Sequence, residues 1–319
     1  MKGQFFLKAV CLSAGILTAT FLGGCGMAEN ADDGRPDIIC TLFPQYDFAR
    51  QLYGEQADVT MLLKPGMESH MYDPTPEDMK KISEADVFIY TGDEMEPWAA
   101  QIIEGLDDSV TVLDLSEYVT LEMEEEDHEH EHEHGIFEKG HEHRYDPHYW
   151  LDLSNAEAMV EAVSGLSKTL EIEDKESVEK NCEAYVSRLE ALDEAFMEAA
   201  EASEEKDIVF AGRFAYGYFI HRYGLNYETV YQSCSAEADP SVGDMIRVID
   251  HIHEHGTDVV FYEELSSARA AHTIAEDTGV KIREFSTAHN VSKEDFDAGI
   301  TFIDLMERNL SALKEALHV

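Results

Sequence analysis

Basic residues are scarce in this chain of 319 residues. It contains 23 lysines and arginines against 67 aspartates and glutamates, which gives a formal net charge of −44 at pH 7. A surface of this sign repels the phosphates of nucleic acids and anionic lipid headgroups, and it attracts cations. Nucleic acid is therefore not expected as a partner, and the composition favours a protein that handles cations.

Long hydrophobic runs are also missing. The longest apolar stretch, from Ala9 to Leu22, is shorter than the roughly 20 residues that span a bilayer as a helix. Lys2 and Lys8 flank its start, and a short apolar stretch behind basic residues is typical of a secretory leader. We expect residues 1–24 to be a signal peptide.

The leader ends in Leu-Gly-Gly-Cys, in which the cysteine is Cys25. This ending resembles the bacterial lipobox, where the leader is cut before a cysteine whose thiol is then lipidated. Residues 25–36 are small and acidic, as a flexible tether should be. The predicted location is therefore the outer face of a bacterial cell membrane, with the protein anchored by a lipid such as palmitate.

Few cysteines remain for a structural role. Of the five, Cys11 lies in the leader and Cys25 is assigned to the lipid, which leaves Cys40, Cys182 and Cys234. No two of these are spaced as Cys-x-x-Cys, and an odd number in an oxidising compartment leaves at least one free thiol. A disulfide framework is not predicted.

Short β-branched runs alternate with helical stretches in both halves of the chain, which is typical of parallel sheets covered by helices on both faces. In the first half the pattern predicts strands at 38–43, 59–63, 86–90 and 110–115, and helices at 45–53, 76–84 and 97–106. In the second half it predicts strands at 207–210, 227–231, 258–262 and 280–285, and helices at 216–223, 241–255, 268–278 and 292–317.

Residues 174–203 separate these halves and are almost free of glycine and proline. Apolar residues recur there every three or four positions, which predicts one amphipathic helix of about 30 residues. The predicted fold class is therefore α/β, with two lobes joined by one long rigid helix. We place the lobes at residues 37–169 and 206–319 and the linking helix at 170–205. Ligands of such sheets bind beyond the carboxyl ends of the strands, so a site is expected in the cleft between the lobes.

Histidine is concentrated in one acidic segment. Six imidazoles lie among carboxylates between His128 and His143, within a loop that we place at residues 122–143. Neutral imidazole is a common ligand of zinc, nickel and copper. A run this polar cannot bury a core, so we predict an exposed loop that attracts a transition metal. The alternative is a solvated acidic loop without a specific role.

Three further histidines lie on loops, two of them directly after predicted strands. His70 follows the strand at 59–63, His148 follows the His-rich loop, and His289 follows the strand at 280–285. Because they come from both halves, we expect them to meet in the cleft as a metal site.

Another group of histidines has a less specific pattern. His251, His253 and His255 alternate along a predicted helix, so we expect them not to share one face and to lie in solvent near the end of the helix.

Several motifs occur in a recognisable order. They are Gly-Met-Glu-Ser-His-x-Tyr-x-Pro-Thr-Pro from Gly66, the acidic His-rich loop, Asp-Pro-His-x-Trp-Leu from Asp146, and the long central helix. Together with the lipobox they resemble the substrate-binding lipoproteins of zinc and manganese ABC transporters, over the whole mature chain. The resemblance implies that His70 and His148 are metal ligands. It also implies a membrane permease, driven by a separate ATPase, as the partner. We further expect a monomer without enzymatic activity.

The chain departs from the family's pattern at two ligand positions. The third ligand, a histidine or glutamate, falls at Arg213, whose guanidinium has no lone pair to give a metal. The fourth, usually an aspartate, falls near His289. We therefore predict ligation by His70, His148 and His289, with water or an acid such as Glu237 in the fourth position. An ion pair between Glu237 and Arg213 is an open alternative.

Ligand type also bears on the metal. Three imidazoles with at most one carboxylate suit Zn²⁺ better than Mn²⁺, which prefers oxygen ligands. The predicted function is capture of Zn²⁺ and its delivery to the permease. The alternatives are a Mn²⁺-specific protein of the same type, a secreted zinc hydrolase, and an adhesin or metal buffer that acts through its His-rich loop. The hydrolase is less favoured because no general base is evident beside the ligands.

Overall fold

The computed structural model describes residues 34–69, 72–122, 145–231 and 240–319. Residues Arg35–Val319 form one compact unit. None of the helices in the described ranges combines the length and the apolar character that crossing a membrane requires.

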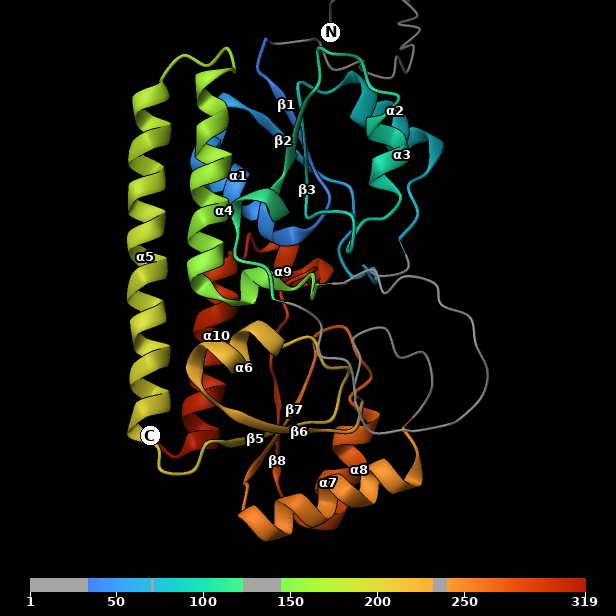
Figure 1. The fold of residues 1–319 in the computed structure, drawn as a ribbon, viewed down its shortest axis with the longest axis vertical. Coiled ribbons are helices and arrows are strands. Elements are labelled where there is room, and N and C mark those ends of the chain that lie inside the picture. The colour runs from blue at the N-terminus through green and yellow to red at the C-terminus, as the bar shows by residue number, and fades with distance from the viewer. Residues whose placement is uncertain (1–33, 70–71, 123–144, 232–239) are drawn as a thin grey trace, which may run out of the picture. The chain divides into compact units, whose positions relative to one another are not determined.

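Two parallel four-stranded sheets confirm the predicted α/β class (Figure 1). The strand order of the first sheet is β2-β1-β3-β4, and the second repeats it as β6-β5-β7-β8. The first sheet consists of β1 (Asp37–Cys40), β2 (Asp58–Met61), β3 (Val87–Tyr90) and β4 (Thr111–Asp114). The second consists of β5 (Asp207–Phe210), β6 (Asn226–Thr229), β7 (Val259–Tyr262) and β8 (Lys281–Glu284). Since every neighbouring pair is parallel, the carboxyl ends of the strands share one edge of each sheet.

Helices cover both faces of each sheet. Those of the first half are α1 (Phe43–Tyr53), α2 (Pro76–Glu84), α3 (Ala99–Ile103) and α4 (Leu153–Gly165). Those of the second half are α6 (Gly217–Tyr223), α7 (Val242–His255), α8 (Arg269–Thr278), α9 (Lys293–Asp297) and α10 (Phe302–Leu317). Short 3₁₀ segments lie at Gly54–Gln56, Leu115–Tyr118, Tyr149–Leu151 and Leu166–Lys168.

The layers follow from the direction of the side chains, because successive side chains of a strand point to opposite faces of the sheet. In β1, Ile38 and Cys40 join the large core that also contains residues of α1 and α4. Ile39 points the other way, into a smaller cluster with Ile82 of α2 and Ala99 of α3. In the second sheet, a comparable small cluster joins β5 and β7 to α7 and α8.

The predicted linking helix is α5 (Lys175–Ala202), a single helix of 28 residues. Asp174 caps it by accepting a hydrogen bond from the Ser177 N–H at 3.0 Å. It packs against α4 over its first part and also contacts α1 and α10 (Figure 1). Helices from both halves therefore share its apolar face.

The long final helix predicted from Ser292 to Leu317 is wrong, because the structure has two helices there. Ser292 caps only α9, which ends at Asp297. Gly299 then adopts a φ of +75°, a left-handed conformation that favours glycine and ends the helical path. Thr301 starts α10 with a cap of its own, by accepting a hydrogen bond from the Asp304 N–H at 3.1 Å.

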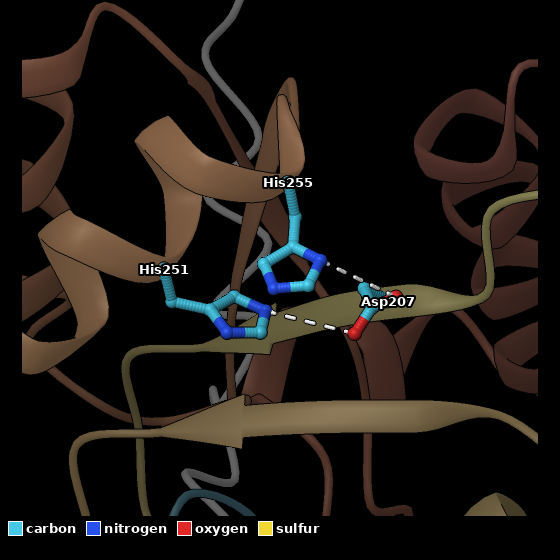
Figure 2. A group of neighbouring side chains, drawn as sticks. All are labelled: Asp207, His251 and His255. Atoms are coloured by element: carbon cyan, nitrogen blue, oxygen red, sulfur yellow. Dashed lines mark ion pairs between the residues drawn. The ribbon is translucent and has the colours of Figure 1, made fainter.

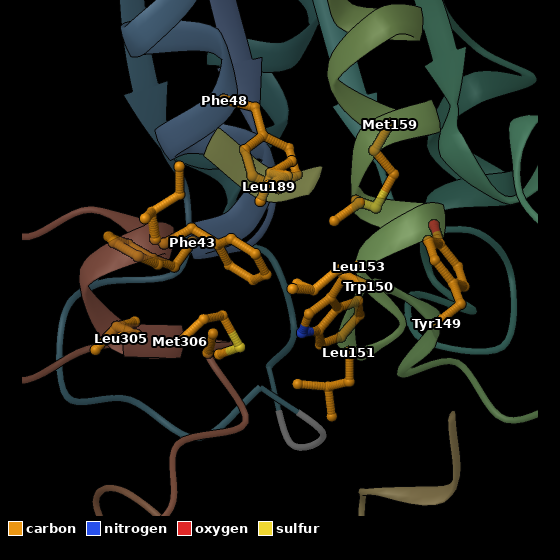
Figure 3. Packing of buried hydrophobic residues seen from close by; sticks show 14 of the residues in the cluster. Phe43, Phe48, Tyr149, Trp150, Leu151, Leu153, Met159, Leu189, Leu305 and Met306 are labelled. Carbon is orange, nitrogen blue, oxygen red and sulfur yellow. The ribbon is translucent and has the colours of Figure 1, made fainter. Parts of the chain in front are cut away.

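The largest core draws on both halves of the chain. Figure 3 shows Phe43 and Phe48 of α1 near Leu189 of α5 and Met306 of α10, with Trp150 close by.

A buried carboxylate lies in the same region. Asp47 of α1 accepts hydrogen bonds from the Tyr185 hydroxyl of α5 and from the Phe302 N–H of α10, both at 2.8 Å. It also forms an ion pair with Arg50, at 2.8 Å. The Asp47 side chain thus links α1 to both α5 and α10.

Candidate metal centre

His148 lies in Asp146-Pro147-His148, just before the 3₁₀ turn Tyr149–Leu151, and is fully buried. Its Nδ1 is 2.7 Å from Oδ1 of Asp146, and the same oxygen accepts from the His148 N–H at 2.9 Å. Burial lowers the pKa of His148, and the Asp146 carboxylate offsets this only in part. The lowered pKa favours the neutral imidazole that a metal ligand requires, and Asp146 orients the ring.

Asp152, four residues after His148, has a different role. Its carboxylate caps α4 by accepting from the Ser154 N–H at 2.8 Å, and it pairs with Arg222 at 3.0 Å. The negative charge at the start of the helix favours this position over contact with the histidine.

His289 follows β8 and is mostly buried. Its Nδ1 is hydrogen-bonded to the Thr287 hydroxyl, which donates to Oε1 of Glu264. Because the hydroxyl proton goes to the carboxylate, the imidazole must supply the proton on Nδ1, which leaves the lone pair on Nε2. Glu264, two residues beyond β7, thus sets the tautomer of His289 through Thr287. Burial raises the pKa of Glu264, but its bonds to His289 and Thr287 outweigh this and hold it below the usual range.

The structure brings His148 and His289 together. Their ring centroids are 5.1 Å apart, and Trp150 lies within 5.9 Å of both. The Trp150 indole N–H donates to the Thr287 carbonyl at 2.8 Å. This bond ties the segment of His148 to the segment of His289, although the two belong to different halves of the chain.

The loop that precedes His70 is joined to the same place. Asn290 donates to the carbonyls of Lys64 and Met67, each at 2.8 Å, and the Gly66 N–H donates to the Val291 carbonyl at 2.8 Å. His70 itself lies outside the described residues, as do Glu237 and the His-rich part of the predicted loop at 122–143.

A small pocket opens between these segments. Its volume is about 20 Å³, which leaves room for roughly one water-sized occupant. Glu68 and Ser69 line it from the first half, and Glu264, Thr287 and His289 line it from the second, with Met67, Arg213, Glu263, Leu265 and Asn290 around them.

Arg213 binds two carboxylates at the pocket wall. Its Nε donates to Glu263 at 2.8 Å, and its Nη2 donates to Glu68. Burial lowers the pKa of Arg213, but these two carboxylates outweigh it and raise the pKa overall. The open alternative of an ion pair between Glu237 and Arg213 stays untested, because Glu237 lies outside the described residues. Among the described residues, the partners of Arg213 are Glu263, directly after β7, and Glu68 of the opposite loop.

The sequence did not identify Glu68 and Thr287 as residues of the site. Each lies two residues before a predicted ligand, His70 or His289, and that proximity is the only signal in the sequence that could have marked them. Glu263 and Glu264, which follow β7, both line the pocket.

Comparison with known proteins gives a consistent result. The family model for zinc-uptake complex component A, periplasmic, matches residues 38–316. The high-affinity zinc uptake system protein ZnuA of Bacillus subtilis is 32% identical over 311 residues, covering 95% of this chain and 97% of its own. The zinc-binding lipoprotein AdcA of Streptococcus pneumoniae serotype 4 is 32% identical over 310 residues, and the match covers 97% of this chain but 61% of that protein.

A solved structure agrees with this assignment. The Zn(II)-bound ZnuA-like domain of Streptococcus pneumoniae AdcA has a TM-score of 0.73 and 28% identity, and the match covers 90% of this chain and 100% of that domain. A family match over most of the chain, and a relative covered nearly end to end, leave one conclusion: the chain belongs to the family of zinc-uptake complex component A.

Proposed function

We propose that this protein captures Zn²⁺ outside the cytoplasm and delivers it to an ABC permease driven by a separate ATPase. The observation that carries the proposal is the pair of buried imidazoles of His148 and His289. Each is held through Nδ1, so the Nε2 of each bears the lone pair that a metal needs. The names of the relatives, which speak of zinc binding and zinc uptake, support zinc as the cargo.

The proposed ligand set is His70, His148 and His289, with water or Glu237 in the fourth position. His70 is supported by the anchoring of its loop, since the chain up to Ser69 lines the same pocket as His289. Three imidazoles favour Zn²⁺ over Mn²⁺. The acidic surface should add a general attraction for cations.

We also propose that the protein binds zinc without turning over a substrate. Family members are named for uptake and binding, and a carrier needs tight, stoichiometric and reversible binding. Hydrolysis of generic ester or peptide substrates by the zinc-loaded protein would instead favour the alternative of a secreted hydrolase.

The test is a zinc competition titration of ligand variants against a chelator. His148→Ala and His289→Ala should each weaken the tight site by several kcal/mol, which is about 100-fold or more, because each removes a direct metal bond. His70→Ala should do the same. His272→Ala, at an exposed histidine of α8, is the matched control and should leave affinity unchanged.

A variant at Arg213 separates the proposed metal ligands from a charged residue of the pocket wall. Arg213→Ala should change zinc affinity less than the histidine variants do. Arg213 is bound to Glu68 and Glu263, and its guanidinium cannot ligate a metal. Unchanged affinity in His289→Ala, with the metal held by an acid such as Glu237, would overturn the ligand set and move the preferred metal toward manganese.

A further inference from the structure

A second group of metal-ligand side chains lies away from the candidate metal centre. Asp207, the first residue of β5, faces His251 and His255 on the last turns of α7 (Figure 2). One ligand atom from each residue lies within 4.8 Å of the ligand atoms of the other two. His251 Nε2 is 3.7 Å from one Asp207 oxygen, and His255 Nδ1 is 3.8 Å from the other.

The spacing of the two histidines explains why they meet. Residues four apart lie on the same face of a helix, whereas residues two apart do not. The expectation that His251, His253 and His255 would not share a face was therefore wrong for the outer two. Their rings are stacked, with centroids 4.2 Å apart and an angle of 19° between the planes. His253, between them in sequence, is exposed.

The environment of the group is that of a partly enclosed site. The side chains of Asp207 and His251 are each 17% exposed, and that of His255 is 38% exposed. The Nε2 atom of His251 is buried and forms no hydrogen bond to any described residue. Its 3.7 Å distance to Asp207 is too long for one. Buried polar atoms are normally hydrogen-bonded, so this nitrogen is available to bind a further group. A metal ion is such a group, and it suits a histidine that faces a carboxylate.

The distances suit a small metal ion. In a tetrahedral zinc site with bonds of about 2.0–2.1 Å, ligand atoms are about 3.4 Å apart. The two nitrogen–oxygen distances, which run to different oxygens of Asp207, exceed that value by a few tenths of an ångström. The ligand atoms of all three residues lie within 4.8 Å of one another, so side-chain rotations would bring them into range. Two imidazoles and a carboxylate are suited to Zn²⁺, and three protein ligands leave a fourth position for water.

We propose that Asp207, His251 and His255 form a second binding site for one divalent transition metal of the zinc class. The site lies at the amino end of β5, whereas Arg213, Glu264 and His289 follow the carboxyl ends of their strands. It is therefore built independently of the candidate metal centre, and its bound ion joins α7 to the sheet. Its partial exposure makes it weaker than a buried site, so it fills after the tight one.

The direct test uses crystals of the mature full-length protein soaked with Zn²⁺, with diffraction measured above and below the zinc absorption edge. The expected result is an anomalous peak bounded by Asp207, His251 and His255, in addition to any peak at His148 and His289. A zinc peak at the candidate metal centre with none at Asp207 would overturn the second site and leave the proposed function intact.

A solution test separates this site from the His-rich loop, which is unchanged in all the variants. Protein preloaded with one equivalent of Zn²⁺ is titrated calorimetrically with more. Asp207→Asn and His251→Ala should each bind one equivalent fewer than the wild type, and His253→Ala, the matched control, should lose none. Equal binding in all four proteins, or an equal loss in His253→Ala, would refute the site. Asp207→Asn preserves the shape of the side chain, so its result stands even if His251→Ala loosens α7.

Discussion

Glu96 is a buried carboxyl group at the carboxyl edge of the first sheet, where it joins the ends of two strands. It accepts hydrogen bonds from the Thr41 hydroxyl, beyond β1, and from the N–H and hydroxyl of Thr91, beyond β3. Burial nevertheless raises the pKa of Glu96 to about 8, because these bonds offset only part of the desolvation.

This shift predicts a pH dependence of stability. Between the ordinary glutamate pKa and about 8, the folded protein keeps a proton on Glu96 that the unfolded chain has lost. The stabilisation is therefore fully present below about pH 4.3, the ordinary pKa of an exposed glutamate, and is lost as pH rises toward 8. Glu96→Gln should flatten the fall of the unfolding free energy between pH 5 and 9, measured by urea denaturation.

Glu117→Gln, at an exposed glutamate of the same half, serves as the control and should keep the wild-type slope. An identical slope in Glu96→Gln would mean that Glu96 is ionised in the folded protein throughout this range.

Single residues also show how far the sequence could lead to the site. The meeting of His148 and His289, which lie on loops of different halves, could be predicted from the rule that ligands of such sheets bind in the cleft beyond the carboxyl ends of the strands. The ion pairs of Arg213 could not be predicted, since Glu68 is 145 residues away in sequence and their contact depends on how the two halves meet. The hydrogen bonds that join Glu264, Thr287 and His289 could not be predicted either, because they depend on the path of the backbone after β8.

Among the elements, α5 offers a sharp test of packing. Leu189 is completely buried, among residues of α1 and α4, whereas Met197 on the same helix is 38% exposed. Leu189→Ala should lower the free energy of unfolding by about 2–5 kcal/mol, because it opens a cavity in a dense core. Met197→Ala should cost well under half of that. Similar losses for both variants in urea denaturation would show that α5 contributes little to the shared core.

The His-rich loop is a second element with a clear test. We expect its removal to eliminate weak metal sites and to leave one tight site per chain, measured by calorimetric zinc titration. The deletion should cover residues 123–143 and retain Glu122, because the Glu122 carbonyl accepts from the Asp146 N–H at 3.1 Å and its N–H donates to Tyr218 at 2.7 Å. Loss of all tight binding would favour a metal buffer that acts through the loop alone.

The elements most readily predicted were those with strong local signals. Thr75 and Pro76 marked the start of α2, and the predicted range Pro76–Glu84 matches the structure. The helix α4 was not predicted, because many of its residues are buried and its sequence lacks a clear polar face. The break between α9 and α10 was missed because a single glycine in a helical pattern does not by itself end a helix.

At the scale of the whole molecule, membrane attachment is proposed to depend on Cys25 alone. Cys25→Ala should release the protein into the soluble fraction and leave zinc affinity in vitro unchanged, because the lipid anchor and the folded part act separately. The check is fractionation of cells that express each form, followed by zinc titration of both. A variant that stays in the membrane fraction in high salt would show that something other than the lipid holds it.

The two halves of the molecule could be predicted as separate αβ patterns, but their shared core could not. Periodicity reports which face of an element is apolar, and it does not say which distant element covers that face. The proposed lobes at 37–169 and 206–319 are therefore divisions of the sequence. The structure adds that α10, at the end of the second range, also packs against α1 in the first.

The place of α10 has a consequence for the order of events during synthesis. Asp47 accepts one of its hydrogen bonds from the Phe302 N–H, a partner 255 residues further along the chain, so the first half alone cannot supply all the partners of this buried carboxylate. The shared core also contains residues of α10, so it can be complete only after almost the whole chain has been synthesised. For a protein proposed to cross the membrane behind a leader, this delay is useful, because a chain that folded early inside the cell could not be threaded outward.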